Sequence, residues 1–510
     1  MQCLKSSASD LKRLIAEVTH QGRSMQLTAI DPENWVNSIY KPTPTIVEAA
    51  QALYRDHDVT EISRSDASAT NLSETADEIS RIIKNAKVTS RKAICFVTGV
   101  PGAGKTLAGL SVTTSQMNHV EDEHAVFLSG NGPLVKVLQE ALAKDLNSRQ
   151  SISMLEARRQ TKTFIQNIHH FRDESLESEL PPADRVVVFD EAQRAWDQHH
   201  TVKFMRQKKG KVNFNSSEPE FLIEVLDRHE DWCVIIALIG GGQEINSGEA
   251  GLSEWFKALE KRFRHWDIYH SKLISSSEYA GNINYTELTN VLKTHPREAL
   301  HLSVSLRSFR AGRLSEFVHH LINNNSSRAF DFLAAIQKTF PIVLTRDLAK
   351  AKAWLKQRTR GNELCGVTAS SGGRRLKPEG IDVKAAIEPE NWFLNGPEDV
   401  RSCQYLEDVA TEFSIQGLEL DWVAVAWDAD LRRDSDNWVY RRFSGTKWQN
   451  INKKDKQQYL LNAYRVLLTR ARQGMVIFVP QGDRSDPTRL PEFYDPIANY
   501  LQKTGIPLID

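Results

Sequence analysis

One glycine-rich segment constrains this chain more than any other feature. The segment GVPGAGKT (99–106) fits the pattern GxxxxGK[ST]. It follows an apolar run, AICFV, and precedes a helix-like stretch, TLAGLSVTTSQM. Glycines let such a loop curl so that its N–H groups face phosphate oxygens at the positive end of the next helix. The segment predicts a nucleotide-phosphate site between a strand and a helix, whereas the simpler alternative is an ordinary glycine-rich turn.

The residues of this loop have different expected tasks. The Lys105 ammonium would neutralise the β- and γ-phosphates, and the Thr106 hydroxyl would ligate magnesium. The other expected contacts of the loop with the nucleotide are Gly99, Pro101, Gly102, Ala103 and Gly104.

A second motif, VVVFDEAQR (186–194), places two acids at the end of an apolar strand. Asp190 would hold magnesium through water, and Glu191 would polarise the attacking water. An Asp-Glu pair at a strand end is common by itself. Together with the glycine-rich loop, it predicts ATP hydrolysis with ATP and Mg²⁺ as the bound groups.

Composition limits the partners. Lys plus Arg equals Asp plus Glu, at 65 each, so a nucleic-acid surface would have to be a local basic groove. The five cysteines are scattered, without a CxxC pair, which favours a reducing compartment. The apolar runs all fall short of the ~20 residues needed to span a bilayer. We expect a cytoplasmic protein without a membrane partner.

Hydrophobic patterning predicts the fold. Leu11, Leu14, Ile15 and Val18 line one helical face, and further helices are expected near 49–54 and from a Thr75–Glu78 capping box onward, after a polar linker at 63–70. Two series of strand-length apolar runs then alternate with helix-length segments. The first series is 93–99, 125–130, 186–191 and 233–240, and the second is 341–345, 364–369, 422–427 and 474–480. Such runs suit parallel strands covered by helices on both faces.

The chain, 510 residues long, is too long for one core. We expect an α/β protein with two RecA-like P-loop domains and a small helical N-terminal region. The predicted ranges are 1–85 for the helical region, 86–300 for the first domain and 301–510 for the second.

Together with segments further along the chain, these motifs resemble superfamily 1 DNA/RNA helicases over roughly residues 90–485. The motif sequences are most similar to those of the family called domain of unknown function 2075, which is related to the ATPase part of Schlafen proteins. DEAQ (190–193) resembles motif II, which implies that Gln193 couples the ATP state to the strand-binding surface. IGGGQEI (239–245) falls where motif III belongs, and Gln243 matches its phosphate-sensing glutamine.

The second domain carries three further resemblances. LSVSLRS (302–308) is similar to motif IV, so that Arg307 would reach the γ-phosphate. ATEFSIQGLELD (410–421) is similar to motif V, with Gly417 and Glu419 at its signature positions. NAYRVLLTRAR (462–472) resembles motif VI, which implies that Arg470 is a second arginine finger and that Tyr464 packs near the nucleotide. Two arginines from a second domain would stabilise transition-state charge.

Motif III and the segment after it depart from the family pattern. Gly241 stands where these helicases usually have Asp, and the aromatics that stack on bases are replaced by NSGEAGLSEW. Trp255 is the nearest candidate for stacking, although a tryptophan at this spacing is more often part of a core.

A single strand of DNA or RNA would lie across both domains. The expected contacts are Ser129, Asn131 and Lys136 from the first domain and Ser370, Arg374 and Arg375 from the second. RQKKGK (206–211) and YRRF (440–443) are further basic loops, and all of these segments also suit plain solvated loops. His169 in FIQNIHHF is expected to be packed or to contact the strand.

The sequence thus predicts an ATP-hydrolysing helicase or translocase acting on single-stranded nucleic acid. The alternative is an ATP-dependent switch or scaffold that recruits a nuclease or another partner protein, as in bacterial defence modules, without processive unwinding.

Overall fold

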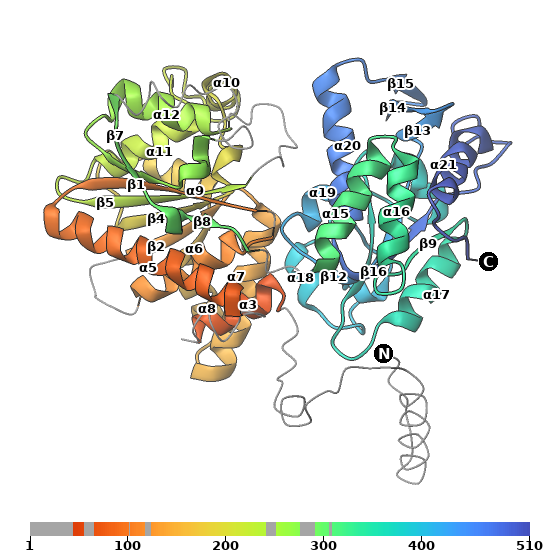
Figure 1. Cartoon of the computed structure of the whole chain (residues 1–510), viewed down its shortest axis with the longest axis horizontal. Helices are drawn as coiled ribbons and strands as arrows, with labels where there is room; N and C mark the ends of the chain where they lie inside the picture. The colour runs from red at the N-terminus through yellow and green to blue at the C-terminus, as the bar shows by residue number, and fades with distance from the viewer. Residues whose placement is uncertain are drawn as a thin grey trace, which may run out of the picture. The chain divides into compact units, whose positions relative to one another are not determined.

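The computed structural model describes residues 44–55, 66–100, 102–117, 124–240, 251–275, 291–304 and 309–509. The helix predicted from Leu11 to Val18 lies outside these residues. In the described part of the chain, parallel strands form two separate sheets (Figure 1). The α/β architecture predicted from the two series of apolar runs is therefore confirmed. The predicted domain boundaries remain a prediction.

The first sheet has the order β3-β2-β4-β5-β1-β6-β7, and β8 pairs with the end of β1. Every strand pair in it is parallel. Its strands are β1 (Lys92–Gly99), β2 (His124–Ser129), β3 (Ile165–Asn167), β4 (Asp184–Asp190), β5 (Cys233–Gly240), β6 (Asp267–His270), β7 (Lys293–Pro296) and β8 (His301–Leu302). Because parallel strands share one carboxyl edge, the carboxyl ends of β1, β4 and β5 lie at the same edge of the sheet.

Helices cover both faces of this sheet, which is why its strands are apolar throughout. Cys95 and Val97 of β1 share a core with α5, α6 and α7, whereas Ile94 and Phe96 point to the other face and share a core with α11 and α12. The helices of this part are α3 (Ile46–Tyr54), α5 (Asp66–Thr89), α6 (Lys105–Met117), α7 (Gly132–Gln150), α8 (Met154–Phe164), α9 (Ile168–Ser175), α10 (Gln198–Lys208), α11 (Glu218–Asp227) and α12 (Gly251–Arg262). Short 3-10 helices are η1 (Ala192–Arg194), η2 (Lys272–Ser275) and η3 (Glu298–Leu300).

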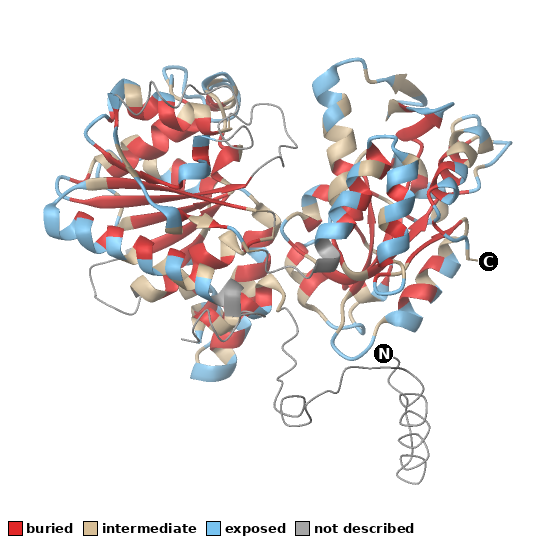
Figure 2. Ribbon diagram, viewed as in Figure 1, coloured by how far each residue is buried: buried red, intermediate tan, exposed pale blue. Residues whose placement is uncertain are grey.

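The second sheet has the order β11-β10-β12-β16-β9 and is also parallel. Figure 2 shows its strands as a buried layer between more exposed helices. The strands are β9 (Ile342–Thr345), β10 (Cys365–Ala369), β11 (Val409–Thr411), β12 (Leu420–Ala426) and β16 (Ala471–Phe478). Its helices are α15 (Phe309–Ile322), α16 (Ser326–Ile336), α17 (Leu348–Arg358), η4 (Arg374–Glu379), α18 (Pro389–Leu394), η5 (Cys403–Tyr405), α19 (Glu412–Ile415), α20 (Lys454–Leu468) and α21 (Pro491–Lys503).

Two local predictions were wrong. The linker expected at 63–70 is helical from Asp66, where α5 begins, so Thr75 lies inside a helix rather than at its N-cap. The Thr75 hydroxyl donates instead to the carbonyls of Asn71 and Ala299, at 2.9 and 2.6 Å. The supposed basic loop YRRF is part of a strand in a small antiparallel sheet, formed by β13 (Leu431–Asp434), β14 (Asn437–Ser444) and β15 (Lys447–Asn450).

Candidate nucleotide site

The glycine-rich loop joins β1 to α6 at the carboxyl edge of the first sheet. Gly102 and Gly104 have φ angles of 76° and 83°, which favour glycine because a Cβ atom is strained there. Gly99 has no room for a side chain, because a Cβ atom would lie 2.8 Å from Cβ of Leu302. The Lys105 ammonium donates to the carbonyls of Gly99 and Val100, at 2.8 and 3.3 Å, so it folds back over its own loop.

The two motifs meet at one point, as the sequence predicts. The Thr106 hydroxyl lies 3.1 and 3.3 Å from the two carboxylate oxygens of Asp190 at the end of β4. Burial, followed by the charge of Glu191, raises the pKa of Asp190 to about 7. A raised pKa means that the charged form of the buried carboxylate is poorly stabilised by its surroundings. A divalent cation bound next to it would stabilise that charged form. A hydroxyl and a carboxylate that converge in this way fit magnesium with a bound nucleotide.

Glu191 follows directly and occupies an unusual backbone conformation. Its φ of 54° is left-handed, a strained region for a residue with a side chain, and such strain gathers at functional sites. Its carboxylate accepts a hydrogen bond from the Gln193 amide and lies 3.4 Å from Nε of Arg194. The strained turn thus holds Glu191 next to Asp190 with cationic and amide partners.

Gln193 connects this turn to the next strand. It is buried, and its Oε1 atom accepts a hydrogen bond from the backbone N–H of Gly240 at 2.9 Å. Gly240 ends β5, and the following residues 241–250 lie outside the described residues. Sequence reasoning named Gln193 but missed Gly240, although its place at the end of an apolar strand was a usable signal.

Several predicted site residues cannot be placed. Pro101, Gln243 and Arg307 lie outside the described residues, so their roles stay predictions. Arg470 is described and buried at the end of α20, where its Nε donates to the Val466 carbonyl at 3.2 Å. Gly417 has a φ of 76° and is exposed, and Glu419 is half-buried. The structure leaves the roles of these three residues as predictions.

Tyr464 does not match its predicted role. Its side chain is fully buried in the second part of the chain, and its hydroxyl donates to Asp430 at 2.6 Å. Its ring lies 4.4 Å from the ring of Trp427, centroid to centroid. The structure therefore places Tyr464 in a core and not on a surface against which a nucleotide could pack.

The two serines that were predicted to contact a nucleic-acid strand are buried, so these two predictions are also wrong. Ser129 and Ser370 are each 1% exposed. The Ser129 hydroxyl accepts from the Asn131 N–H at 3.2 Å, and the Ser370 hydroxyl donates to Asp430 at 2.7 Å. Both hydroxyls organise their own loops, because a small polar side chain just after a strand readily bonds to nearby groups.

The other predicted strand contacts have diverse surroundings. Lys136 and Arg374 are exposed, and Arg374 also donates to the Phe443 carbonyl at 3.3 Å. Arg375 pairs with Asp486 at 2.7 Å and stacks on the Phe443 ring. Asn131 caps α7 through Leu134 N–H, and its amide donates to the Gln416 carbonyl at 2.6 Å. Only Lys136 and Arg374 of these four are therefore open to a strand as they stand.

Trp255 proves to be part of the core. It is fully buried beside Phe96 and Phe189, and its indole N–H donates to the Ala192 carbonyl at 2.9 Å. It therefore supports the turn after Asp190 from below.

Comparison with known proteins gives the class to which this fold and site belong. Residues 92–481 match the family described as Schlafen group 3, DNA/RNA helicase domain, and the chain belongs to that family. The chain is accordingly a helicase-like protein, and this character supports an ATPase-like function at the family level.

Two other comparisons add little. Among solved structures, one match is the crystal structure of the Pyrococcus furiosus Hef helicase domain, with 13% sequence identity and a TM-score of 0.26. The match covers 79% of this chain and 96% of the Hef chain. A search of curated proteins found no match. In the described part of the chain, no helix is both long and apolar enough to cross a membrane.

Proposed function

We propose that this chain is an ATP-hydrolysing translocase or helicase of the superfamily 1 type that acts on single-stranded nucleic acid. The observation that carries the proposal is the convergence of Thr106 and Asp190, at 3.1 Å, beside the strained turn of Glu191. The family match supports it at the level of a helicase-like domain. The finer resemblance to the domain of unknown function 2075 rests on the sequence motifs alone.

Each residue has a distinct task in this proposal. Thr106 and Asp190 would hold magnesium, which would neutralise charge on the phosphates. Lys105 leaves the carbonyls of Gly99 and Val100 to bind the β- and γ-phosphates, and the loop N–H groups surround them. Glu191 orients the attacking water and accepts its proton.

In this proposal, Gln193 couples the ATP site to the surface that binds the nucleic-acid strand. Its contacts with Glu191 and with Gly240 join the hydrolytic carboxylate to the segment that contains Gln243. Arg307 and Arg470 would reach the phosphates from the second domain, which makes domain closure depend on the nucleotide. A cycle of closure and release would move the protein along its strand.

The test is ATP turnover with single-stranded DNA, single-stranded RNA, duplex DNA or no nucleic acid. A translocase is stimulated at least about tenfold by one of the single strands, because the strand completes the coupling network. Equal turnover in all four conditions would contradict the proposal and point to a switch gated by a partner protein.

A further inference from the structure

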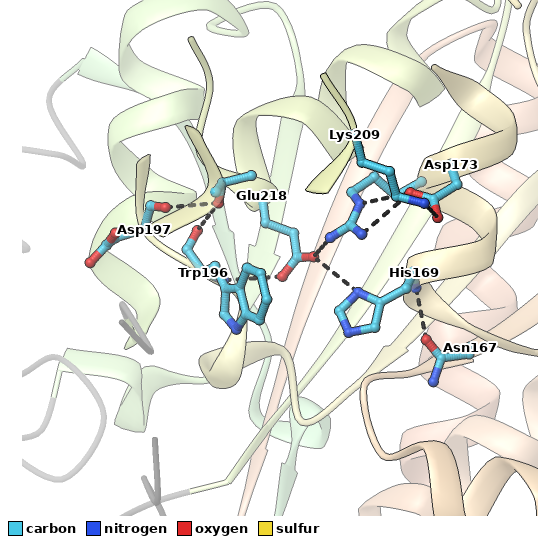
Figure 3. A network of polar contacts seen from close by, with 9 residues as sticks. Asn167, His169, Asp173, Trp196, Asp197, Lys209 and Glu218 are labelled. Carbon is cyan, nitrogen blue, oxygen red and sulfur yellow. Dashed lines mark hydrogen bonds and ion pairs between the residues drawn. The ribbon is translucent and has the colours of Figure 1, made fainter. Parts of the chain in front are cut away.

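Two aromatic side chains lie side by side near the carboxyl edge of the first sheet. His169 is the second residue of α9, directly after β3, and Trp196 follows η1. Their ring centroids are 5.6 Å apart, with an angle of 49° between the ring planes. Figure 3 shows the two rings on either side of the Glu218 carboxylate.

A buried ion pair fixes this arrangement. The side chains of Arg172 and Glu218 are 1% and 3% exposed and are paired at 3.2 Å. The other carboxylate oxygen of Glu218 accepts from the backbone N–H of Trp196 at 3.1 Å. The backbone N–H of Glu218 in turn donates to the Trp196 carbonyl at 3.0 Å. Since breaking a buried pair on one side is costly, the pair keeps the backbone of Trp196 close to α9, the helix that carries Arg172 and His169.

The rings themselves remain partly open to solvent. The His169 side chain is 40% exposed, and Trp196 is half-buried. Burial, followed by the charge of Arg172, lowers the pKa of His169 to about 4, so the imidazole is neutral near pH 7. Its Nδ1 atom has no hydrogen-bond partner among the described residues and lies 4.0 Å from the Glu218 carboxylate. The neutral imidazole and the indole, tilted at 49° to each other, are each partly open to a stacked base.

The surroundings of this pair suit a nucleic-acid strand. A Cβ atom on Gly132 would lie 3.4 Å from the Asn167 amide, so the start of α7 abuts the start of α9. On the other side, Phe204 of α10 packs edge-on against Trp196, with centroids 5.3 Å apart. Lys203 precedes Phe204 and Lys208 lies one turn beyond it, and both are exposed. Aromatic rings flanked by cations are the usual composition of a single-strand site.

We propose that His169 and Trp196 form an aromatic step on which one base of a bound single strand stacks, with Lys203 and Lys208 contacting the adjacent phosphates. The proposal rests on the proposed function. It adds a site for one base at a position where the sequence predicted only that His169 is packed or contacts the nucleic-acid strand. Trp196 lies three residues after Gln193, so a short stretch of backbone links the proposed base site to the turn that holds Glu191.

The test compares two oligonucleotides of equal length, one of deoxythymidine and one in which every position is abasic. Binding to the full-length chain is measured by fluorescence anisotropy over a series of salt concentrations, and the two strands are compared at the same salt concentration. Trp196→Ala should weaken binding of the thymidine strand about tenfold, the size of one lost stack, and should change binding of the abasic strand less than about twofold. The readout is the difference between the strands, which a merely structural defect does not produce.

Further variants keep the result decisive if Trp196→Ala folds poorly. Trp196→Phe should keep most of the preference for the thymidine strand, and His169→Ala should lose part of it. Lys203→Ala should weaken both strands alike and reduce the dependence on salt. Phe330→Ala removes an aromatic side chain that is 51% exposed on α16 and should change neither affinity, which makes it the matched control.

The outcomes separate the two proposals. If the wild-type chain binds neither DNA strand nor a single-stranded RNA of the same length, both the proposed function and the aromatic step are wrong. If the wild-type chain binds, but Trp196→Ala and His169→Ala leave the preference for the thymidine strand intact, only the aromatic step is overturned. Equal weakening of both strands by folded Trp196→Ala also overturns it.

Discussion

The backbone N–H of Gly240 donates to the side-chain oxygen of Gln193 at 2.9 Å. This bond joins the end of β5 to the turn after β4, because the amide of the same glutamine donates to Glu191. A Cβ atom on Gly240 would lie 3.0 Å from that amide nitrogen and 3.3 Å from the Glu191 carboxylate. The ends of the two strands are therefore joined through a glutamine side chain that packs closely against a glycine.

Gly240→Ala should displace Gln193 and slow ATP turnover. The new methyl group is closer to Gln193 and Glu191 than an ordinary contact allows, so the side chains must shift by a few tenths of an ångström. We expect turnover to fall about tenfold at saturating ATP, an effect of the size expected for a misplaced catalytic group. Steady-state turnover and a thermal melt check this.

A double-mutant cycle supplies the control. If Gly240→Ala acts through Gln193, it should add little to the effect of Gln193→Ala, since contacting residues are not additive. Independent, additive losses would show that the methyl group acts elsewhere.

Lys105→Ala and Glu191→Gln test the nucleotide site itself. Each should lower ATP turnover by about 10²–10³-fold, because each removes a charge that acts in the transition state. Lys105→Ala should also weaken nucleotide binding, whereas Glu191→Gln should leave it nearly intact. Lys162→Ala removes an exposed lysine on α8 and serves as the control. Turnover that survives both substitutions would refute the site.

The sequence predicted the strands that are continuous apolar runs and missed the strands that are not. The runs at 93–99 and 233–240 match β1 and β5 within a residue, because strands buried on both faces must be apolar throughout. In contrast, β7 (Lys293–Pro296) is polar and partly exposed, and its position depends on pairing with β6. A strand defined only by its neighbour leaves no pattern of its own.

The candidate site divides in the same way. Thr106 and Asp190 were found from their motifs, because the spacing of strand, loop and helix fixes where they lie. Ser370 was misjudged, since its burial depends on Asp430, a residue 60 positions away. The step formed by His169 and Trp196 depends on Glu218, which no local pattern connects to either.

Stability should depend on pH through Asp430. Burial, followed by the charge of Asp428, raises the pKa of Asp430 to about 7, although Ser370 and Tyr464 donate to it. The folded chain then binds more protons than the unfolded chain between about pH 4 and pH 7, so stability falls as pH rises through this range. Asp430→Asn removes the titration and keeps an acceptor oxygen.

We expect Asp430→Asn to melt at least about 2 °C higher than the wild type at pH 8, and this gain to shrink at pH 5. Melting curves at both pH values check the sign. A gain that is equal or larger at pH 5 would contradict the assigned pKa shift.

Asn71 of α5 should act as a clamp on the segment after β8. Its Oδ1 atom accepts from the N–H groups of Ser303 and Val304, at 2.9 and 3.3 Å, and its amide donates to the His301 carbonyl at 3.3 Å. The same segment borders the glycine-rich loop, because the Leu302 carbonyl accepts from Val100 N–H at 3.0 Å.

Asn71→Ala should raise hydrogen exchange in residues 301–304 and cost about 1 kcal/mol of stability. Asn71→Asp keeps the acceptor for both N–H groups and loses only the donor, so its exchange should lie between those of the wild type and Asn71→Ala. Unchanged exchange at residues 303 and 304 in Asn71→Ala would show that the clamp does not hold this segment.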